Sequence, residues 1–423
     1  MRSDLGVTRR RYEAWSAGPV VAVRYPIVTV PSRRRHDRAA TLCRHRYDDA
    51  ANERGEMRAI AASTVVLACA AAGTPLAAQS GSDVEVRLTG RIQVQYNTTS
   101  AEEDEPGALP WSTFETRRVR LAAQIAVGDW ITGIIEPEYA LGDLQLRLVW
   151  INLGFTDAVQ LRLGQMKKPF GRIFLESSTQ TAGIERGVRI RGLADELEAA
   201  DQGAAAPVLT AFAGAPLIGE EQYILDTTGY QGYDLGAALH GALGRMRYEV
   251  GVFNGSGSDR RDENDAKAVA ARLSAEPARS VPLTLGVAAT HHQRFAGGAE
   301  VDGNAAELFA EWSRFRERGL HVIAEVVTGS TLAVDDSFLA AQGVASYFHP
   351  VGGRVEGVEP VARVSWGDAR RDVEGDAGLL VTPGVNLYFF GRNRLMLDWD
   401  IFVPEGDRFE STHALRAQAQ VHF

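Results

Sequence analysis

The sequence predicts an all-β fold, namely a transmembrane antiparallel β-barrel of about 16 strands. Three observations lead to this fold class. The chain ends in a strand that alternates between apolar and polar residues, a matching strand opens the region after residue 80, and the connections between the strand-like segments alternate between short and long.

The closing strand is the clearest of the three. Residues 415–423 read LRAQAQVHF, in which apolar and polar side chains alternate without a break. A side-chain period of two is typical of a β-strand. The terminal Phe423 shares the apolar face, and residues 84–96 alternate in the same way. Strands of this kind indicate that one face meets lipid and the other a watery lumen.

Further strand-like segments fill the region between these two ends, and an even number near 16 is expected because bacterial barrels close with even counts. A strand count of 14 or 18 remains open, because residues 203–229 would accommodate another hairpin. The predicted segments are 84–96, 114–127, 130–141, 144–154, 159–167, 232–243, 246–253, 267–275, 281–290, 305–315, 320–328, 338–349, 358–367, 377–390, 394–403 and 413–423.

The connections support this count, because bacterial barrels have short periplasmic turns and longer outer loops. Residues 142–143 are short for an outer loop, and 350–357 are long for a turn. The predicted periplasmic turns are 128–129, 156–158, 244–245, 316–319 and 391–393. The predicted outer loops are 97–113, 168–231, 254–266, 291–304 and 404–412.

The N-terminal region reads as a targeting segment. Met57-Arg58 precedes an apolar run over 59–72 and then small residues, which is typical of a signal peptide over 57–79 with cleavage near Ala78 or Gln79. Translation is therefore expected to start at Met57, and residues 1–56 are interpreted as a mis-assigned upstream extension. A disordered basic leader is the alternative for 1–56. The barrel domain is expected to span 80–423.

Composition narrows the class of protein. The only cysteines, Cys43 and Cys69, precede the expected cleavage point, so the mature chain would contain no disulfide. Residues 66–69 resemble a lipoprotein signal only loosely. Loss of residues 1–58 would leave a net charge of −15, which argues against nucleic-acid binding. No mature segment reaches 18 uninterrupted apolar residues, so no transmembrane helix is expected.

Motifs for chemistry are missing from the sequence, and neither an enzyme nor a cofactor is expected. Residues 254–258 resemble a nucleophile elbow but lack its flanking glycine. The pair His291-His292 has no third ligand at zinc spacing, and the acidic run 259–265 is interpreted as a solvated loop rather than a Ca²⁺ site. Two rival hypotheses are an exported barrel with a surface enzyme activity and a soluble β-sandwich adhesin.

Several segments resemble the phosphate-selective porin O/P family of bacterial outer-membrane channels. The most specific is residues 164–171, GQMKKPFG, where a strand enters a long loop. The resemblance implies an outer-membrane location, 16 strands, a homotrimer, a third loop folded into the lumen, and passive diffusion of small hydrophilic solutes with anions or phosphate preferred. A general non-selective porin is the alternative. The matching segments are 114–121, 161–171, 248–255, 271–273, 345–348 and 394–397.

Basic residues are the candidates for lining the pore and binding anions. Arg118 and Arg120 should face the lumen, because a charge on the lipid side at mid-membrane costs about 2–4 kcal/mol. Rings of Arg or Lys favour anions in a pore. The alternative is that inward arginines pair with Glu or Asp across strands and stiffen the wall. The full set of candidates is Arg118, Arg120, Arg162, Lys167, Lys168, Arg172, Arg186, Arg189 and Arg191.

Overall fold

The structure is a computed structural model, and its described residues all lie in the second of the two units into which the chain divides, Val66–Phe423. The predicted signal peptide, residues 1–56, Arg189, Arg191 and the possible hairpin over 203–229 lie outside the described residues. The described residues are 84–99, 112–140, 143–186, 230–260, 262, 265–296, 299–330, 337–368, 371–372, 374, 377–405 and 411–423.

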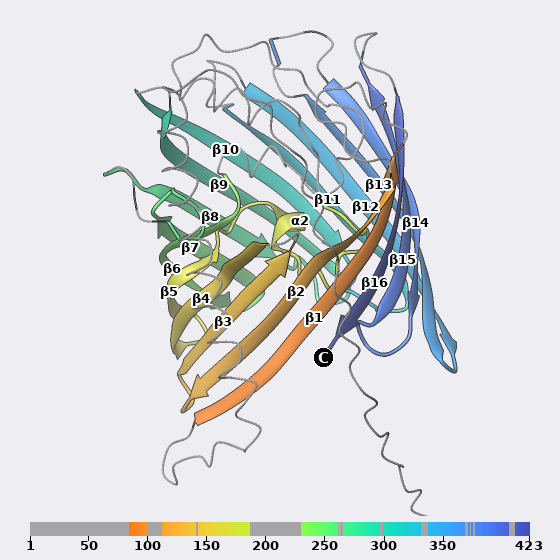
Figure 1. Cartoon of the computed structure of the whole chain (residues 1–423). Helices are drawn as coiled ribbons and strands as arrows, with labels where there is room; N and C mark the ends of the chain where they lie inside the picture. Colours follow the sequence, from red (N-terminus) through yellow and green to blue (C-terminus); the bar gives the residue numbers. More distant parts are fainter. Residues whose placement is uncertain are drawn as a thin grey trace, which may run out of the picture. The chain divides into compact units, whose positions relative to one another are not determined.

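The described chain forms a closed antiparallel barrel in which each strand pairs with its sequence neighbours and β1 pairs with β16 (Figure 1). The predicted fold class and the count of 16 strands are confirmed, and closure excludes the β-sandwich alternative. The first eight strands are β1 Val84–Thr99, β2 Ser112–Val127, β3 Ile131–Ala140, β4 Asp143–Thr156, β5 Val159–Lys167, β6 Tyr233–Leu243, β7 Met246–Phe253 and β8 Ala268–Ala275. The others are β9 Leu283–Ala296, β10 Ala299–Trp312, β11 Gly319–Ser330, β12 Ser337–Gly352, β13 Val355–Asp368, β14 Ala377–Tyr388, β15 Arg394–Pro404 and β16 Thr412–His422.

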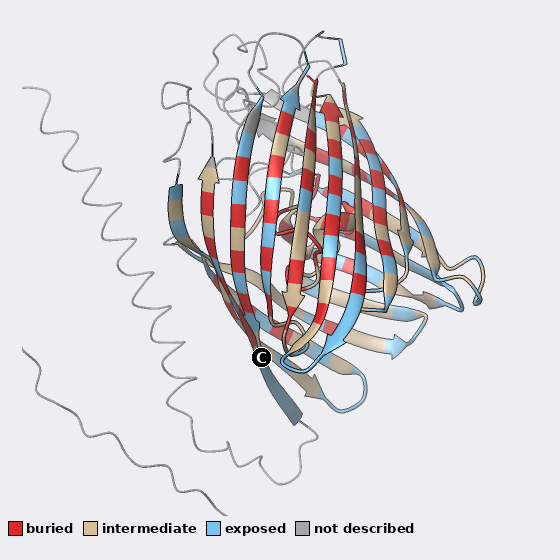
Figure 2. Cartoon of the chain, turned by 90° about the vertical axis from the view of Figure 1, so that its right-hand side faces the viewer, coloured by how far each residue is buried: buried red, intermediate tan, exposed pale blue. Residues whose placement is uncertain are grey.

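The strands bury their polar faces and expose their apolar faces, the reverse of a soluble sheet. In β1, Val86 is 58% exposed, whereas Gln95 is 1% exposed and Asn97 is fully buried. Figure 2 shows the resulting alternation of buried and exposed residues along the strands. An apolar outer band around a polar interior is the pattern of a transmembrane barrel.

The last residue extends the pairing of β1 with β16 that closes the barrel. The backbone N–H of Gly90 donates to the carbonyl of Phe423 at 2.8 Å, and Phe423 N–H donates to the Gly90 carbonyl at 3.1 Å. A Cβ at Gly90 would lie 2.5 Å from Phe423 Cζ and 2.8 Å from the Arg120 carbonyl oxygen. Glycine is therefore required where the terminal aromatic ring crosses the first strand.

Two predicted connections are wrong in length. The expected outer loop 291–304 is mostly strand, because β9 and β10 continue to the pair Ala299 and Ala296. The expected long turn 350–357 is tight, with Gly352 paired to Val355 and Gly353 at φ 81°. Polar residues near the rim suggested loops, but a barrel wall is polar on its inner face at any height.

Candidate functional site

One connection lies against the inner wall, and we call its described part, residues 168–186, the docked segment. It leaves β5 after Lys167 and contains the single described helix turn, α2 Arg172–Leu175 (Figure 1). Gly171 precedes this turn at φ 78°, a left-handed conformation that favours glycine. Its hydrogen bonds, described below, join it to side chains from both sides of the barrel.

Carboxylates from β10 and β11 hold the start of α2. The two carboxylate oxygens of Glu307 accept from the backbone N–H groups of Gly171 at 2.9 Å and Arg172 at 2.6 Å. Glu325 accepts from the N–H of Ile173 at 2.9 Å. Backbone donors to a carboxylate make strong, charge-assisted hydrogen bonds. These acidic residues therefore bind the chain's own loop.

The side chains of this turn extend the same contacts. Arg172 donates to Glu311 at 2.6 Å, and this pair joins α2 to β10. Burial raises the pKa of the nearby Glu176 carboxyl above its usual range. Farther along the chain, burial raises the pKa of the Tyr230 hydroxyl to about 12, so it stays a donor to the Ser330 carbonyl, 2.8 Å away.

The rest of the docked segment binds the wall formed by β1 and β13–β16. Its backbone carbonyls at Ser178, Thr179, Thr181, Ala182 and Glu185 accept from Gln93, Gln420, Arg394, Asn386 and Arg363, respectively. In the other direction, Ile184 N–H donates to Asp398 at 2.7 Å. The segment therefore covers this part of the wall.

The candidates Arg118 and Arg120 lie in a buried ion-pair network. Arg120 binds Glu136 at 2.9 Å and also contacts Glu138. Glu136 in turn accepts from Arg91 at 3.1 Å. Only 8% of the Arg120 side chain and 9% of the Arg118 side chain are exposed. Their arrangement matches the alternative of a stiffened wall.

A bulge brings a further arginine into this network. The register between β1 and β2 shifts between Gln93 and Val94, so that Arg117 becomes the extra residue of β2. Arg117 donates to Glu185 at 2.8 Å, and Arg118 lies 3.6 Å from the same carboxylate. Sequence parity alone does not reveal the bulge.

Arg162 and Arg147 differ from these residues because they remain partly open. The Arg162 side chain is 23% exposed, pairs with Glu249 at 3.2 Å, and lies over the Trp150 ring at 4.9 Å. Arg147 is 26% exposed and pairs with Glu138 at 2.7 Å. These two arginines lie on β4 and β5, and neither makes a described contact with the docked segment.

The two lysine candidates bind groups at the start of the loop. Lys167 Nζ donates to the carbonyls of Phe174 at 2.5 Å and Glu176 at 3.4 Å. Lys168 lies 3.9 Å from the fully buried Asp234. Arg186 donates to the Glu176 carbonyl at 2.7 Å. The structure therefore brings these residues together around the docked segment itself.

Sequence reasoning missed a second buried network on β13, β15 and β16. Asp400 accepts from Arg363 and Arg416, both at 3.0 Å, and all three side chains are buried. The alternation of each strand would have placed these residues inward. Their mutual contact depends on the strand register: Arg416 faces Asp398, and its guanidinium reaches Asp400, two residues farther along β15.

Ionisable residues are distributed unevenly around the barrel. Strands β1–β5 carry eight Arg or Lys and five Asp or Glu, whereas β10 and β11 carry five acidic residues and neither Arg nor Lys. The strand order places β10 opposite β2. On the acidic side, Glu307 and Glu325 bind α2. On the opposite side, β1–β5 carry more basic than acidic residues and therefore an excess of positive charge.

The described residues offer no helix with the length and apolar character needed to cross a membrane. Within the same residues, no three His, Cys, Asp or Glu side chains group as metal ligands. The paired histidines diverge, since His291 contacts Asn304 and His292 lies beside Tyr230.

Fold and wall together define a channel-type β-barrel of the bacterial outer membrane rather than an enzyme. Residues 86–306, more than half of the 423 residues, match the family described as phosphate-selective porin O and P, and the chain belongs to this family.

Solved structures agree on the fold. An anion-selective porin from Comamonas acidovorans matches with a TM-score of 0.56 at 12% identity, over 81% of this chain and 100% of that chain. The outer membrane channel DcaP of Acinetobacter baumannii matches with a TM-score of 0.51 at 10% identity, over 80% and 97% of the two chains. At such identities the likeness shows the fold alone. No curated protein matches the sequence.

Proposed function

We propose that the channel carries small hydrophilic solutes by passive diffusion and prefers anions. The observation that supports this preference is the positive excess of β1–β5, where Arg147 and Arg162 keep 26% and 23% of their side chains exposed. Accessible arginines on a pore wall attract anions and repel cations.

The candidates contribute to this preference in different ways. Arg118 and Arg120 act through the field of the wall, because both are buried. Arg120 pairs with Glu136 and Glu138, whereas Arg118 donates to the Gln93 side chain and lies 3.6 Å from Glu185. Arg162 is open enough to touch a solute, and its planar guanidinium suits oxyanions such as phosphate. Because most described lumenal arginines are paired, we propose a preference among small anions rather than exclusive selection of phosphate.

The third loop completes the proposed pore. The hydrogen bonds of residues 168–186 to wall side chains support a loop that lies inside the barrel and narrows it. We propose that Arg172 and Arg186 line this constriction, with Arg189 and Arg191 as further candidates, while Lys167 and Lys168 hold the start of the loop.

Processing and assembly are also proposed. The N-terminal pattern supports cleavage near Ala78 or Gln79 after translation from Met57. The family resemblance supports a homotrimer. N-terminal sequencing of protein from outer membranes tests the first, and the native mass in mild detergent tests the second.

Single-channel conductance tests the proposed function. Protein purified from outer membranes is inserted into planar bilayers bathed in KCl, then in LiCl, then in potassium acetate. Replacing chloride by acetate should lower the conductance more, relative to bulk conductivity, than replacing potassium by lithium. No conductance steps in any salt would contradict the channel, and a larger effect of the cation would contradict the anion preference.

A further inference from the structure

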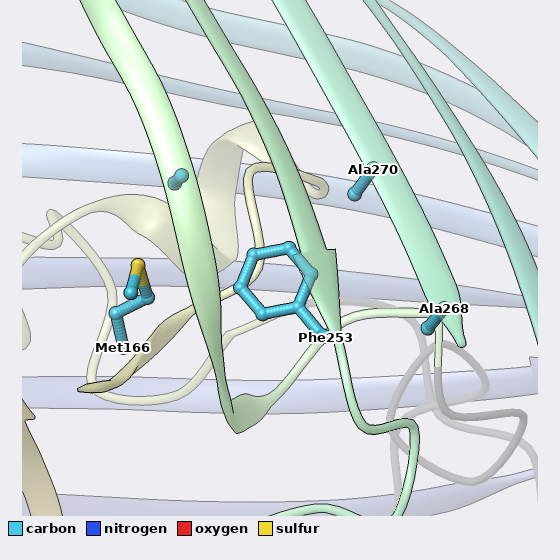
Figure 3. Close-up of a cluster of buried hydrophobic side chains, with 5 residues drawn as sticks. Met166, Phe253, Ala268 and Ala270 are labelled. Carbon is cyan, nitrogen blue, oxygen red and sulfur yellow. The ribbon is translucent and has the colours of Figure 1, made fainter. Parts of the chain in front are cut away.

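Cations on the inner wall of β4–β8 lie against aromatic rings, as Arg394 of β15 also does. On β1, β13 and β16, buried arginines such as Arg91, Arg363 and Arg416 bind carboxylates or the docked segment. On β4 and β5, aromatic rings lie beside the cations as well: Arg147 lies 5.3 Å from the Tyr233 ring and Arg162 lies 4.9 Å from Trp150. An apolar group that includes Met166 of β5 and Phe253 of β7 lies on this wall (Figure 3).

Arg272 of β8 is the extreme case. Its guanidinium carbon lies 4.1 Å from the ring centroid of Phe309, within the range of a cation–π contact. No hydrogen bond or ion pair of this guanidinium is found within the described residues. Stacking uses the face of the guanidinium and leaves its N–H groups, which lie in the plane, available to an acceptor.

The carboxylates around Arg272 are held by other donors. Glu249, its register partner on β7, pairs with Arg162 at 3.2 Å. Glu307 accepts from two backbone N–H groups, and Glu325 accepts from Ile173 N–H and from Gln342. The nearby Arg172 binds Glu311. Arg272 is therefore stacked but not neutralised by a contact of its own.

The ring beneath Arg272 has a fixed place. Phe309 of β10 lies directly opposite Gly286 of β9, and a Cβ at Gly286 would overlap the phenyl ring. The absence of a side chain at Gly286 thus lets the ring lie over the neighbouring strand, an arrangement in which an aromatic covers a strand glycine.

From this geometry we infer that Arg272, stacked on Phe309, is a contact site for small oxyanions such as phosphate on their way through the barrel. The inference rests on the proposed anion-preferring channel and adds a residue to it. The ring holds the guanidinium in place from one side, while the oxyanion accepts from its N–H edge.

Block of the chloride current by phosphate tests the site. Currents of the protein purified from outer membranes are measured in KCl with increasing potassium phosphate. The Arg272→Gln variant should raise the half-blocking phosphate concentration at least fivefold. Phe309→Leu and Gly286→Ala should raise it by a smaller factor, because the guanidinium remains but its support is lost. The half-blocking concentration of Arg272→Lys should lie between those of the wild type and Arg272→Gln.

Two controls match these variants. Arg279→Gln removes a charge from the exposed turn between β8 and β9, and Gly343→Ala adds a Cβ where nothing lies within 4 Å. Phosphate should block the current of both control variants at the same concentration as in the wild type. Heat-modifiable migration on gels verifies that each variant is folded. Failure of Arg272→Gln to fold leaves Arg272→Lys and Phe309→Leu to decide.

The outcomes separate the two proposals. Suppose that the wild-type current prefers anions and is blocked by phosphate. If phosphate then blocks Arg272→Gln, Arg272→Lys and Phe309→Leu equally well, the Arg272 site is overturned and the channel proposal stands. A wild-type current without anion preference or phosphate block overturns both.

Discussion

Removal of the Glu307 carboxylate should release the docked segment from β10. The Glu307→Ala substitution leaves the N–H groups of Gly171 and Arg172 without their acceptor, in a place where Glu307 itself is only 2% exposed. An unpaired buried donor costs about 1–3 kcal/mol, so two of them cost about 2–6 kcal/mol. The contact of Ile173 with Glu325 remains and limits how far the segment moves.

The loss of this free energy should make α2 more accessible to reagents in solution, and labelling of a cysteine measures that accessibility. A reporter cysteine is placed at Ile173, which is 4% exposed, in a protein whose own cysteines are Cys43 and Cys69. A loss of 2 kcal/mol or more, at about 1.4 kcal/mol per factor of ten, should speed labelling by a water-soluble thiol reagent at least ~30-fold. The reference is the same reporter without the second substitution.

Glu405→Ala is the matched control, because Glu405 is exposed at the end of β15. It should leave the labelling rate of the reporter unchanged. An increase of less than about threefold in Glu307→Ala would refute the reasoning, since water would then satisfy the two N–H groups and the carboxylate would not hold the segment.

Three further predictions concern closure, stability and selectivity. Gly90→Ala should reduce the fraction of heat-modifiable barrel, because its Cβ would meet the ring of the last residue, whereas Gly343→Ala should not. Glu138→Gln should lower the free energy of unfolding in detergent by about 3–5 kcal/mol, because the buried Arg120 loses a counter-charge and the partly exposed Arg147 loses its partner; a loss below 1 kcal/mol would contradict the network. Arg162→Gln should reduce anion preference more than Arg118→Gln, as reversal potentials would show, because Arg162 is the more exposed; the opposite order would contradict the role given to exposure.

The fold could be predicted because a barrel strand carries its information locally. Alternation over residues 84–96 and 415–423 indicates which face is apolar without knowledge of any partner. Connection lengths then indicate the strand count. The prediction of a loop over 291–304 is wrong because polarity does not separate an outer loop from a strand that continues farther along the barrel.

The functional site is harder to predict from the sequence than the fold. Parity places Arg120 inward but does not say whether a solute or Glu138 meets its guanidinium, since that depends on register with β3. The docked segment is harder still, because its backbone binds Glu307 and Asp398, which are 91 residues apart in sequence. The contact between Arg272 and Phe309 likewise depends on tertiary packing that no local pattern encodes.

The sign of the reversal potential in a KCl gradient tests the central claim most directly. With the wild-type protein in a planar bilayer, chloride should move through the pore more readily than potassium because of the positive excess on β1–β5. The dilute side should then become negative relative to the concentrated side. A potential of zero, or a dilute side that becomes positive, would contradict an anion-preferring channel.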